Sequence, residues 1–513
     1  MHSPEIKTQN LLTNQIFWIS LLCFVTLILW FPTRNLPYWW DSAGYVIHGA
    51  RYYINTNFSS IFLPSDSAIT AFAHPPFFVF TLALLWRVFG ESLLISHIYY
   101  LMFVLLAVIF TYLLGKTLVN FREEAASHLV GVGAALFLLF SPVFLAQVGI
   151  VYPEIPITAF GVMTVYFFLK KKIPWYLVSA FLMVFTKETS AIVIFAILGI
   201  TLIQFISGFL KKKERNFKKI IKTLFIYSLP LILLASWFVA HKIVTGWMFV
   251  MPYYQENLTK EALSLLKIKL PLRFFFTEQS RAILSLFILG TFLFSVLKKE
   301  KRNFIVRLEI LLFVLVLIFL ILLFGIVDFL HRYIIFGLPF FYVLFFYCLA
   351  VLIEEKSDKD QFIIFFGITL VFLTLFYFSW DNHRSFNNSL HATPLEENLE
   401  YRDIISMGQN MARFIEKYYP NAVVWTAFPT NYMLSEPFQH YVSKPIETHD
   451  CNTYKEGDRV DLVVLHLFSP PQVECFGILN TQDMQNNKFL LLIPFQENGK
   501  WIQIYKNPNL KTL

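Results

Sequence analysis

The sequence predicts a polytopic α-helical membrane protein that carries a C-terminal α/β domain outside the membrane. Of its 513 residues, 57% are hydrophobic and only 15% are charged. A soluble protein of this length could not cover so much apolar surface with so few charges. Long apolar runs fill residues 1–379, and the tail that follows is richer in Asn, Gln and Glu. We therefore divide the chain into a membrane domain, residues 1–379, and a soluble domain, residues 380–513.

Eleven apolar runs are read as membrane-spanning helices, since a span across a core of about 30 Å takes roughly 20 residues. They cover residues 12–31, 93–114, 129–151, 155–169, 175–189, 190–210, 221–244, 282–297, 308–327, 333–353 and 362–378. A further run, residues 75–89, carries Arg87 and would reach only about 23 Å as a helix. We predict that this run is a helix at the membrane interface, within the first outer loop.

The basic residues set the predicted orientation. They gather at Lys116 and Arg122, at 170–172, at 211–219 and at 298–302, which are alternate connections between the predicted spans. Because basic loops stay in the cytoplasm, the N-terminus is expected there and the C-terminal domain on the extra-cytoplasmic face. If residues 75–89 did cross, the first loop would instead be cytoplasmic. This pattern accounts for the net charge of +8 without a nucleic-acid partner.

The tail has the pattern of a small α/β domain. Residues 400–419 have apolar side chains at helical spacing, and residues 422–426, 460–467, 489–493 and 501–505 resemble strands. We find no phosphate-binding loop and no nucleophile elbow in it, which favours a role as a cap or a docking platform for an acceptor. Cys451 and Cys475 could form a disulfide if the tail faces an oxidising compartment.

A few ionisable residues are predicted to meet at the outer face of the membrane. Asp41 follows the first span, Glu154 stands between two prolines, Lys187 precedes Glu188, and Arg332 follows His331. Each has an ordinary explanation, such as a solvated loop carboxylate, a helix N-terminal acid or a cation that snorkels to the interface. Their convergence on one face is harder to dismiss, because charges at membrane depth are costly and usually functional.

The chemistry of this set suits a lipid-linked phosphate. Arginine binds phosphate with a fork of donors and lysine supplies a point charge. A carboxylate near an acceptor hydroxyl could take its proton. From the residues alone, the protein is an enzyme or a transporter that handles a lipid phosphate.

Several short motifs resemble those of the GT-C class of membrane glycosyltransferases. They are Trp39-Trp40-Asp41 after the first span, Ala73-His74-Pro75-Pro76-Phe77, the turn at Lys187, and His331-Arg332-Tyr333 with Pro339. In order and spacing they are similar to the branch of protein O-mannosyltransferases and lipid A aminoarabinose transferases. One departure is Ser42 after Asp41, where that branch commonly has a second acid.

This resemblance implies the GT-C fold and transfer of a hexose or pentose from a polyprenyl-phosphate donor to a hydroxyl of a lipid, glycan or protein. The transfer would invert the anomeric carbon on the extra-cytoplasmic face. Asp41 would be the general base and Glu154 the second acid. The remaining implied residues are Lys187, Arg332 and His74 for the donor phosphate, with Tyr45, Glu188, His331 and Tyr333 as further candidates.

No residue spacing in the sequence marks a metal site, and we expect no obligatory metal. Cations such as Lys187 and Arg332 can offset the charge of a departing monophosphate, although a divalent ion remains compatible with the chemistry. Two alternatives stay open. A transporter or flippase would have repeats and broken helices at mid-membrane, and a non-catalytic relative would bind polyprenyl lipid without transfer.

Overall fold

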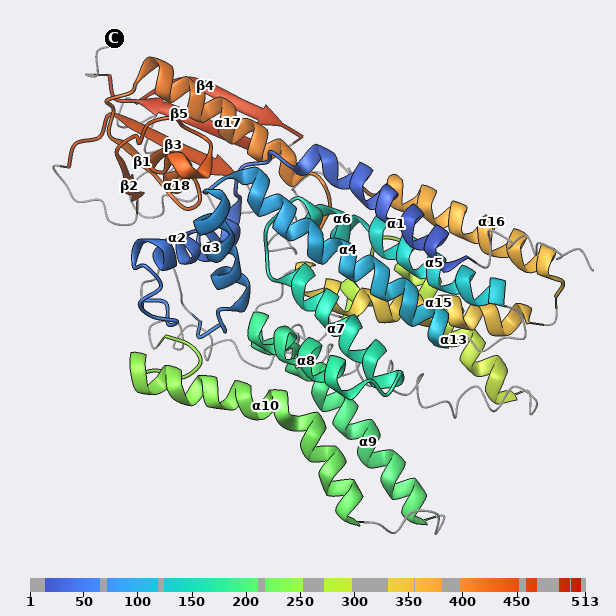
Figure 1. The fold of residues 1–513 in the computed structure, drawn as a ribbon. Helices are drawn as coiled ribbons and strands as arrows, with labels where there is room; N and C mark the ends of the chain where they lie inside the picture. Colours follow the sequence, from blue (N-terminus) through green and yellow to red (C-terminus); the bar gives the residue numbers. More distant parts are fainter. Residues whose placement is uncertain are drawn as a thin grey trace, which may run out of the picture.

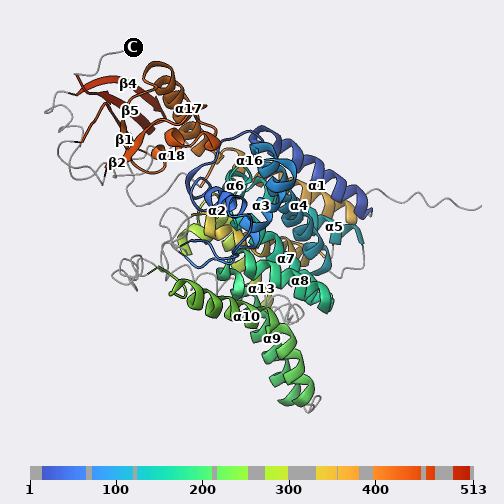
Figure 2. The same ribbon diagram turned by 60° about the vertical axis from the view of Figure 1, so that its left-hand side comes forward.

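The computed structural model is a helical bundle with a five-stranded sheet at one end (Figure 1). The structure describes residues 14–64, 72–118, 124–210, 217–251, 272–297, 331–354, 356–380, 397–451, 458–467, 489–498 and 500–508. The long helices are α1 (Gln15–Trp30), α4 (Leu93–Leu118), α5 (Glu124–Phe140), α7 (Glu154–Leu169), α8 (Ile173–Thr186), α9 (Ile192–Leu210), α10 (Phe217–Thr245), α13 (Arg281–Leu297), α15 (Leu338–Ile353) and α16 (Asp358–Tyr377). Figure 2 shows that the sheet lies beyond the bundle, with α9 and α10 projecting from another side.

Within the described residues, six helices are long and apolar enough to cross a membrane, or seven if one bent pair counts as a single span. Four shorter apolar helices accompany them. The protein is therefore a multi-pass membrane protein, as predicted. The exact number of eleven spans stays a prediction, and the predicted span at 308–327 lies outside the described residues.

Helices α1 and α4 run antiparallel and fix where the first loop lies. At one end the Tyr38 hydroxyl is 2.8 Å from Ser96 Oγ near the start of α4. At the other end Lys116 Nζ, near the end of α4, donates to Gln15 Oε1 at the start of α1. The loop between them thus begins and ends at the same end of the bundle. It holds α2 (Tyr45–Asn55) and α3 (Phe77–Phe89), the predicted short helix, which at 13 residues is about 20 Å long.

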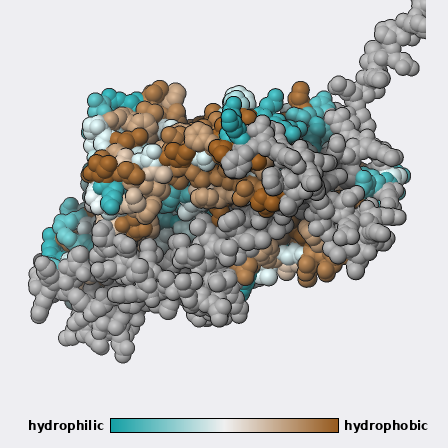
Figure 3. Space-filling view, turned by 90° about the horizontal axis from the view of Figure 1, so that it is seen from below, coloured by the Kyte–Doolittle hydropathy of each residue, from teal (hydrophilic) through white to brown (hydrophobic). Residues whose placement is uncertain are grey.

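The bundle is built around α15, whose residues are almost all buried. This helix is apolar on every side, as expected for one surrounded by other helices. The ring of Phe137 on α5 packs against Phe345 and Phe346 of α15. Outer helices such as α1 and α16 leave large apolar side chains exposed, and hydrophobic residues make up much of the coloured surface in Figure 3. Such a surface suits lipid contact.

The predicted span at 129–151 is not one continuous helix, because the helix breaks at Ser141. Helix α5 ends at Phe140 and α6 (Pro142–Val148) continues at an angle of 67°. Pro142 has no backbone N–H to donate into the preceding turn, and Ser141 adopts a non-helical ψ of 125°. The break turns the chain toward Tyr152 and Glu154.

The C-terminal domain is an α/β sheet domain, as predicted. Its strands are β1 (Val424–Thr426), β2 (Thr448–Asp450), β3 (Leu462–Leu467), β4 (Leu490–Glu497) and β5 (Lys500–Lys506), in the order β2-β1-β3-β5-β4. Strand β1 is parallel to β2 and β3, and β5 pairs antiparallel with both β3 and β4. The prediction missed β2, whose three polar residues carry no strand pattern.

Helix α17 (Tyr401–Tyr418) lies over this sheet, where residues 400–419 were predicted to be helical (Figure 1). Its buried residues form one apolar cluster with the sheet and with Trp39 and Tyr152 of the membrane domain. The C-terminal domain is therefore packed onto the first loop. Cys451 is disulfide-bonded and Cys23 and Cys348 are free thiols, while Cys475, the predicted partner, lies outside the described residues.

Candidate active site

Asp41 lies in a short 3-10 turn, η3 (Trp40–Ser42), that Tyr152 holds in place. The Asp41 backbone N–H donates to the Tyr152 hydroxyl at 3.1 Å, and that hydroxyl donates to the Trp39 carbonyl at 3.2 Å. Trp40 adopts a positive φ of 53°, an unfavourable conformation for a side chain of this size. The Asp41 side chain remains 44% exposed. The backbone is thus fixed while the carboxylate stays accessible.

Arg332 connects the two predicted acids. It is buried in η6 (His331–Gly337), its Nη2 donates to Asp41 Oδ2, and its Nε lies 3.4 Å from Glu154 Oε1. The guanidinium carbon is 4.6 Å from the centroid of the Tyr152 ring, a cation–π contact. A single planar side chain therefore reaches both carboxylates at once.

Glu154 is the first residue of α7, a position where the helix dipole favours an acid. Its Oε1 accepts a hydrogen bond of 2.7 Å from Lys187 Nζ, and both side chains are buried. Lys187 lies between α8 and the 3-10 turn η4 (Glu188–Ala191), with its Nζ 4.6 Å from the centroid of the Tyr333 ring. Two buried cations thus face two carboxylates, and this pairing offsets the cost of burying them.

His74 and Glu188 form a second ion pair beside this centre. His74 Nδ1 is 2.8 Å from Glu188 Oε2, and the Tyr45 ring meets the His74 ring edge-on at 5.5 Å. Glu188 directly follows Lys187, so the two pairs are neighbours along the chain. The structure therefore gathers Asp41, Glu154, Lys187, Arg332 and Tyr333 in one cluster, with His74, Glu188 and Tyr45 next to it.

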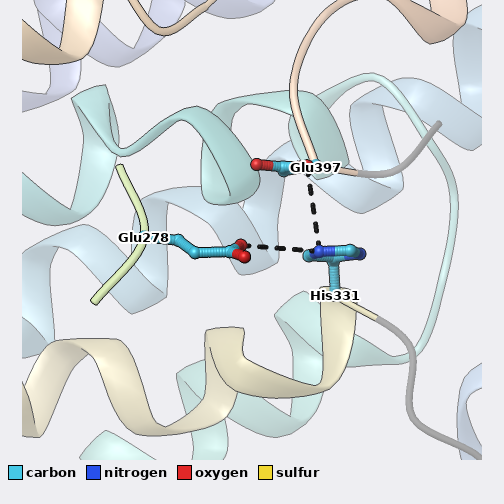
Figure 4. Close-up of side chains that lie close together, drawn as sticks. All are labelled: Glu278, His331 and Glu397. Atoms are coloured by element: carbon cyan, nitrogen blue, oxygen red, sulfur yellow. Dashed lines mark ion pairs between the residues drawn. The ribbon is translucent and has the colours of Figure 1, made fainter. Parts of the chain in front are cut away.

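His331 lies in a different group of side chains. Its Nε2 is 3.6 Å from Glu278 Oε2 and 3.8 Å from Glu397 Oε2, and Figure 4 shows both carboxylates at the same end of the imidazole. Successive residues of a 3-10 helix point about 120° apart, so His331 and Arg332 face different neighbours. These three residues form a group that could hold a metal ion.

Three parts of this region were not predicted from the sequence. Tyr152 was not predicted, although its place two residues before Glu154 was a usable signal. Glu278 and Glu397 carry no motif, and only the fold brings them to His331. The aromatic pair of Trp40 and Phe428, with ring centroids 5.2 Å apart, joins the two domains beside Asp41.

An apolar cavity of about 780 Å³ opens between α3, α4, α7 and α8. Its lining includes Leu84 and Ile98, together with Phe160 of α7 and Leu182 of α8. Phe160 lies six residues after Glu154 and Leu182 five residues before Lys187, so the cavity is about 9 Å along these helices from the charged cluster. An acyl or prenyl chain could lie there with its head among the charges.

The C-terminal domain contacts the same loop through its residues 428–441. Gln439 Nε2 donates to the Ala43 carbonyl at 3.1 Å, and the Tyr441 hydroxyl donates to the Tyr38 carbonyl at 3.2 Å. His48 Nε2 lies 2.7 Å from Glu436 Oε1. These contacts place the C-terminal domain over the side of the loop next to Asp41.

Comparison with known proteins identifies this fold. The sequence matches no protein-family model, and no curated protein matches it. The structure is similar to ArnT from Cupriavidus metallidurans bound to undecaprenyl phosphate, with a TM-score of 0.56 and 10% identity over 95% of this chain and 98% of that one. Apo ArnT gives a TM-score of 0.53 at 12% identity, covering 95% and 97% of the two chains.

The arabinofuranosyltransferase AftD from Mycobacteria is also similar, with a TM-score of 0.51 at 13% identity, over 95% of this chain and 40% of that one. Both relatives span this chain almost completely, from the first helix into the C-terminal domain. The likeness to ArnT and AftD agrees with the motifs around Asp41, His74, Lys187 and Arg332: the chain has the GT-C fold.

Proposed function

We propose that this protein transfers a sugar from a polyprenyl-phosphate donor to an acceptor hydroxyl, with Asp41 as the general base. The observation that carries this proposal is the charged cluster itself. The accessible Asp41 carboxylate pairs with the buried cation Arg332. Arg332 and a second buried cation, Lys187, both lie against Glu154, at the end of the bundle that also holds the first loop. A base beside a phosphate-binding pair is what inverting glycosyl transfer requires.

In this reaction the acceptor oxygen attacks the anomeric carbon as its proton passes to an Asp41 oxygen. The bond between the anomeric carbon and the phosphate oxygen breaks, and the prenyl phosphate leaves with the electron pair. Lys187 and Arg332 would stabilise the charge that grows on that phosphate, with the His74–Glu188 pair beside them. Fixed charges in a partly buried site act strongly because they need no reorganisation. Glu154 holds both cations in position.

The apolar cavity gives the prenyl chain a place to lie. Its lining has no charged side chain and comes mainly from α3 and α4, while Phe160 of α7 and Leu182 of α8 bring it near the charged cluster. That ArnT, with the same fold, has been solved bound to undecaprenyl phosphate supports a donor of this class. The acceptor would approach from the side of the C-terminal domain, where Trp40 and Phe428 offer aromatic faces next to Asp41.

An extra-cytoplasmic site fits the distribution of charge. Lys116 and the basic turn at 170–172 lie at the opposite end of the bundle from Asp41, since α4 and α7 both begin near the site and end at those residues. Basic ends face the cytoplasm. The disulfide at Cys451 suits an oxidising compartment.

A polyprenyl transporter or flippase is the second candidate, and the bend between α5 and α6 favours it, because transporters bind substrates at broken helices. No such break was predicted from the sequence. However, residues 129–151 contain no charged side chain, so the break offers nothing to bind a phosphate. The charges lie instead at the site of Asp41.

The replacement Asp41→Asn separates these functions. The donor class is first identified by mass spectrometry of the lipid that copurifies with the protein. Asparagine keeps the shape of the side chain but cannot accept the acceptor proton, so we expect transfer to fall by about 10²–10⁴-fold with donor binding retained. Asp450→Asn, in β2 of the C-terminal domain, is the control and should leave transfer unchanged. If Asp41→Asn transfers sugar at the same rate as the wild type, Asp41 is not the general base.

A further inference from the structure

Three segments far apart in the sequence bring a histidine and two carboxylates together. Glu278 lies in the turn before α13, His331 begins η6, and Glu397 lies four residues before the start of α17. His331 is only 3% exposed. Figure 4 shows both carboxylates directed at the same imidazole from different parts of the fold. Such a convergence needs a reason, because like charges placed close together repel.

The distances suit a metal ion after a small contraction. One ligand atom from each residue lies within 4.8 Å of the other two, and His331 Nε2 is 3.6 Å and 3.8 Å from the two carboxylate oxygens. Ligands bound to zinc at about 2.1 Å in a tetrahedral site are about 3.4 Å apart. To reach that spacing, the two carboxylate oxygens must move closer to each other, while their distances to His331 Nε2 need to shorten only slightly.

The surroundings hold these ligands in position. Gln279 Nε2 donates to the backbone carbonyl of Glu397 at 2.9 Å, so the turn that carries Glu278 also fixes Glu397. Arg273 Nε is 3.5 Å from Glu278 Oε1, which leaves Oε2 on the side of His331. The Phe274 ring packs on the His331 ring with centroids 4.1 Å apart. Support of this kind around the ligands orients them in metal sites.

We propose that Glu278, His331 and Glu397 bind a divalent metal ion of the zinc class. One imidazole and two carboxylates are a known combination for zinc, and a divalent charge balances two carboxylates next to a neutral imidazole. The ion joins the turn before α13, the start of η6 and the segment that leads into the C-terminal domain. Because His331 precedes Arg332, the ion also fixes the segment that carries the arginine of the active site.

Metal content tests this proposal without using transfer activity. The full chain is purified in detergent with a tag that contains no histidine, incubated with zinc, freed of excess ion and analysed by inductively coupled plasma mass spectrometry. We expect about one zinc per chain and a higher melting temperature than in protein treated with EDTA. The variant Glu397→Gln should retain about 10-fold less zinc than the wild type, and its melting temperature should no longer depend on EDTA.

The control is Glu447→Gln. Glu447 Oε1 also lies near a histidine, 3.2 Å from His449 Nε2, but this pair is exposed. The control should retain zinc as the wild type does. A wild type that holds no zinc and melts at the same temperature with and without EDTA would overturn the proposal, as would equal zinc retention by Glu397→Gln. Either result leaves the proposed transfer reaction standing, since Asp41 is tested separately.

Discussion

At the scale of single residues, Tyr152 links the groups that the reaction would use. Its hydroxyl accepts from the Asp41 backbone and donates to Trp39, while its ring lies against the Arg332 guanidinium. The side chain thus positions both the proposed base, Asp41, and Arg332, the cation proposed to bind phosphate. It contacts neither the proton that is transferred nor the phosphate in the proposed reaction, so we regard it as a positioning residue.

The replacement Tyr152→Phe isolates the hydroxyl from the ring. Loss of two hydrogen bonds should loosen the Asp41 turn, while the ring still packs on Arg332. We expect kcat to fall about 10-fold, which corresponds to about 1.4 kcal/mol, with KM for the donor nearly unchanged. Steady-state kinetics at varied donor concentration measure both constants.

Tyr176→Phe serves as the control for this measurement. Its hydroxyl is likewise buried and donates to a backbone carbonyl, that of Tyr227, at 2.9 Å, but in another part of the bundle. Its kcat should match the wild type. An unchanged kcat for Tyr152→Phe would show that Asp41 is positioned by other contacts.

The sequence predicted this cluster through topology rather than through any contact. Alternate basic loops placed Asp41, Glu154, Lys187 and Arg332 at one end of the bundle, and the structure brings them together there. The direction of a side chain within its turn could not be predicted. That is why His331 was grouped with Arg332 although it faces Glu278 and Glu397.

At the scale of elements, the apolar runs located most helices, because a span must be continuous and apolar. The exception was the break at Ser141, where the run continues without a polar signal although Pro142 interrupts the hydrogen bonding. A serine followed by proline inside an apolar run is a usable mark of such a break. Strand β2 was missed because its pairing depends on β1 and not on its own sequence.

The cavity between α3 and α4 gives a prediction for the donor chain. Ile98 lines it from α4, and a tryptophan there would fill part of the space. With Ile98→Trp we expect KM for a long-chain donor to rise several-fold while a short-chain analogue is used normally, because only the long chain needs the cavity. The readout is transfer with donors of two prenyl lengths.

Leu94→Trp is the matched control, since Leu94 lies one turn earlier on α4, is similarly exposed and does not line the cavity. It should treat both donors as the wild type does. If Ile98→Trp also has wild-type KM values for both donors, the prenyl chain binds elsewhere.

At the scale of the whole molecule, the two predicted domains share a core. Trp39 and Tyr152 pack in the same apolar cluster as α17 and the sheet, and Gln439 and Tyr441 bond to the first loop. The stability of the C-terminal domain therefore bears on the site. Composition predicted the domain, but residue patterns gave no information on where it would rest, since that depends on contacts between distant segments.

His466 makes the stability of this domain depend on pH. Burial in β3 lowers the pKa of His466 from 6.5 to about 4, an effect only partly offset by the hydrogen bond that the imidazole donates to the backbone of Ala427. Between these values the unfolded chain binds the proton more readily, so folding stability falls as pH drops from 6.5 toward 4. The gap corresponds to about 3 kcal/mol. Thermal unfolding at pH 7 and pH 4.5 measures the loss.

His466→Gln should remove this part of the pH dependence, because glutamine does not titrate. His449→Gln replaces an exposed histidine of the edge strand β2 in the same sheet and serves as the comparison. Its melting temperature should fall with pH as the wild type's does. An identical fall in His466→Gln would assign the acid sensitivity to other groups.

The contact between Arg332 and Asp41 has a kinetic consequence. Before any donor arrives, one oxygen of the base is already occupied by the guanidinium. A phosphate that draws the guanidinium toward itself releases that oxygen, so the base becomes free only once the sugar carrier is seated. Substrates should then bind in a compulsory order, the lipid-linked sugar first and the acceptor second. Initial rates measured with a dead-end acceptor analogue test this order, and a pattern typical of random binding would contradict it.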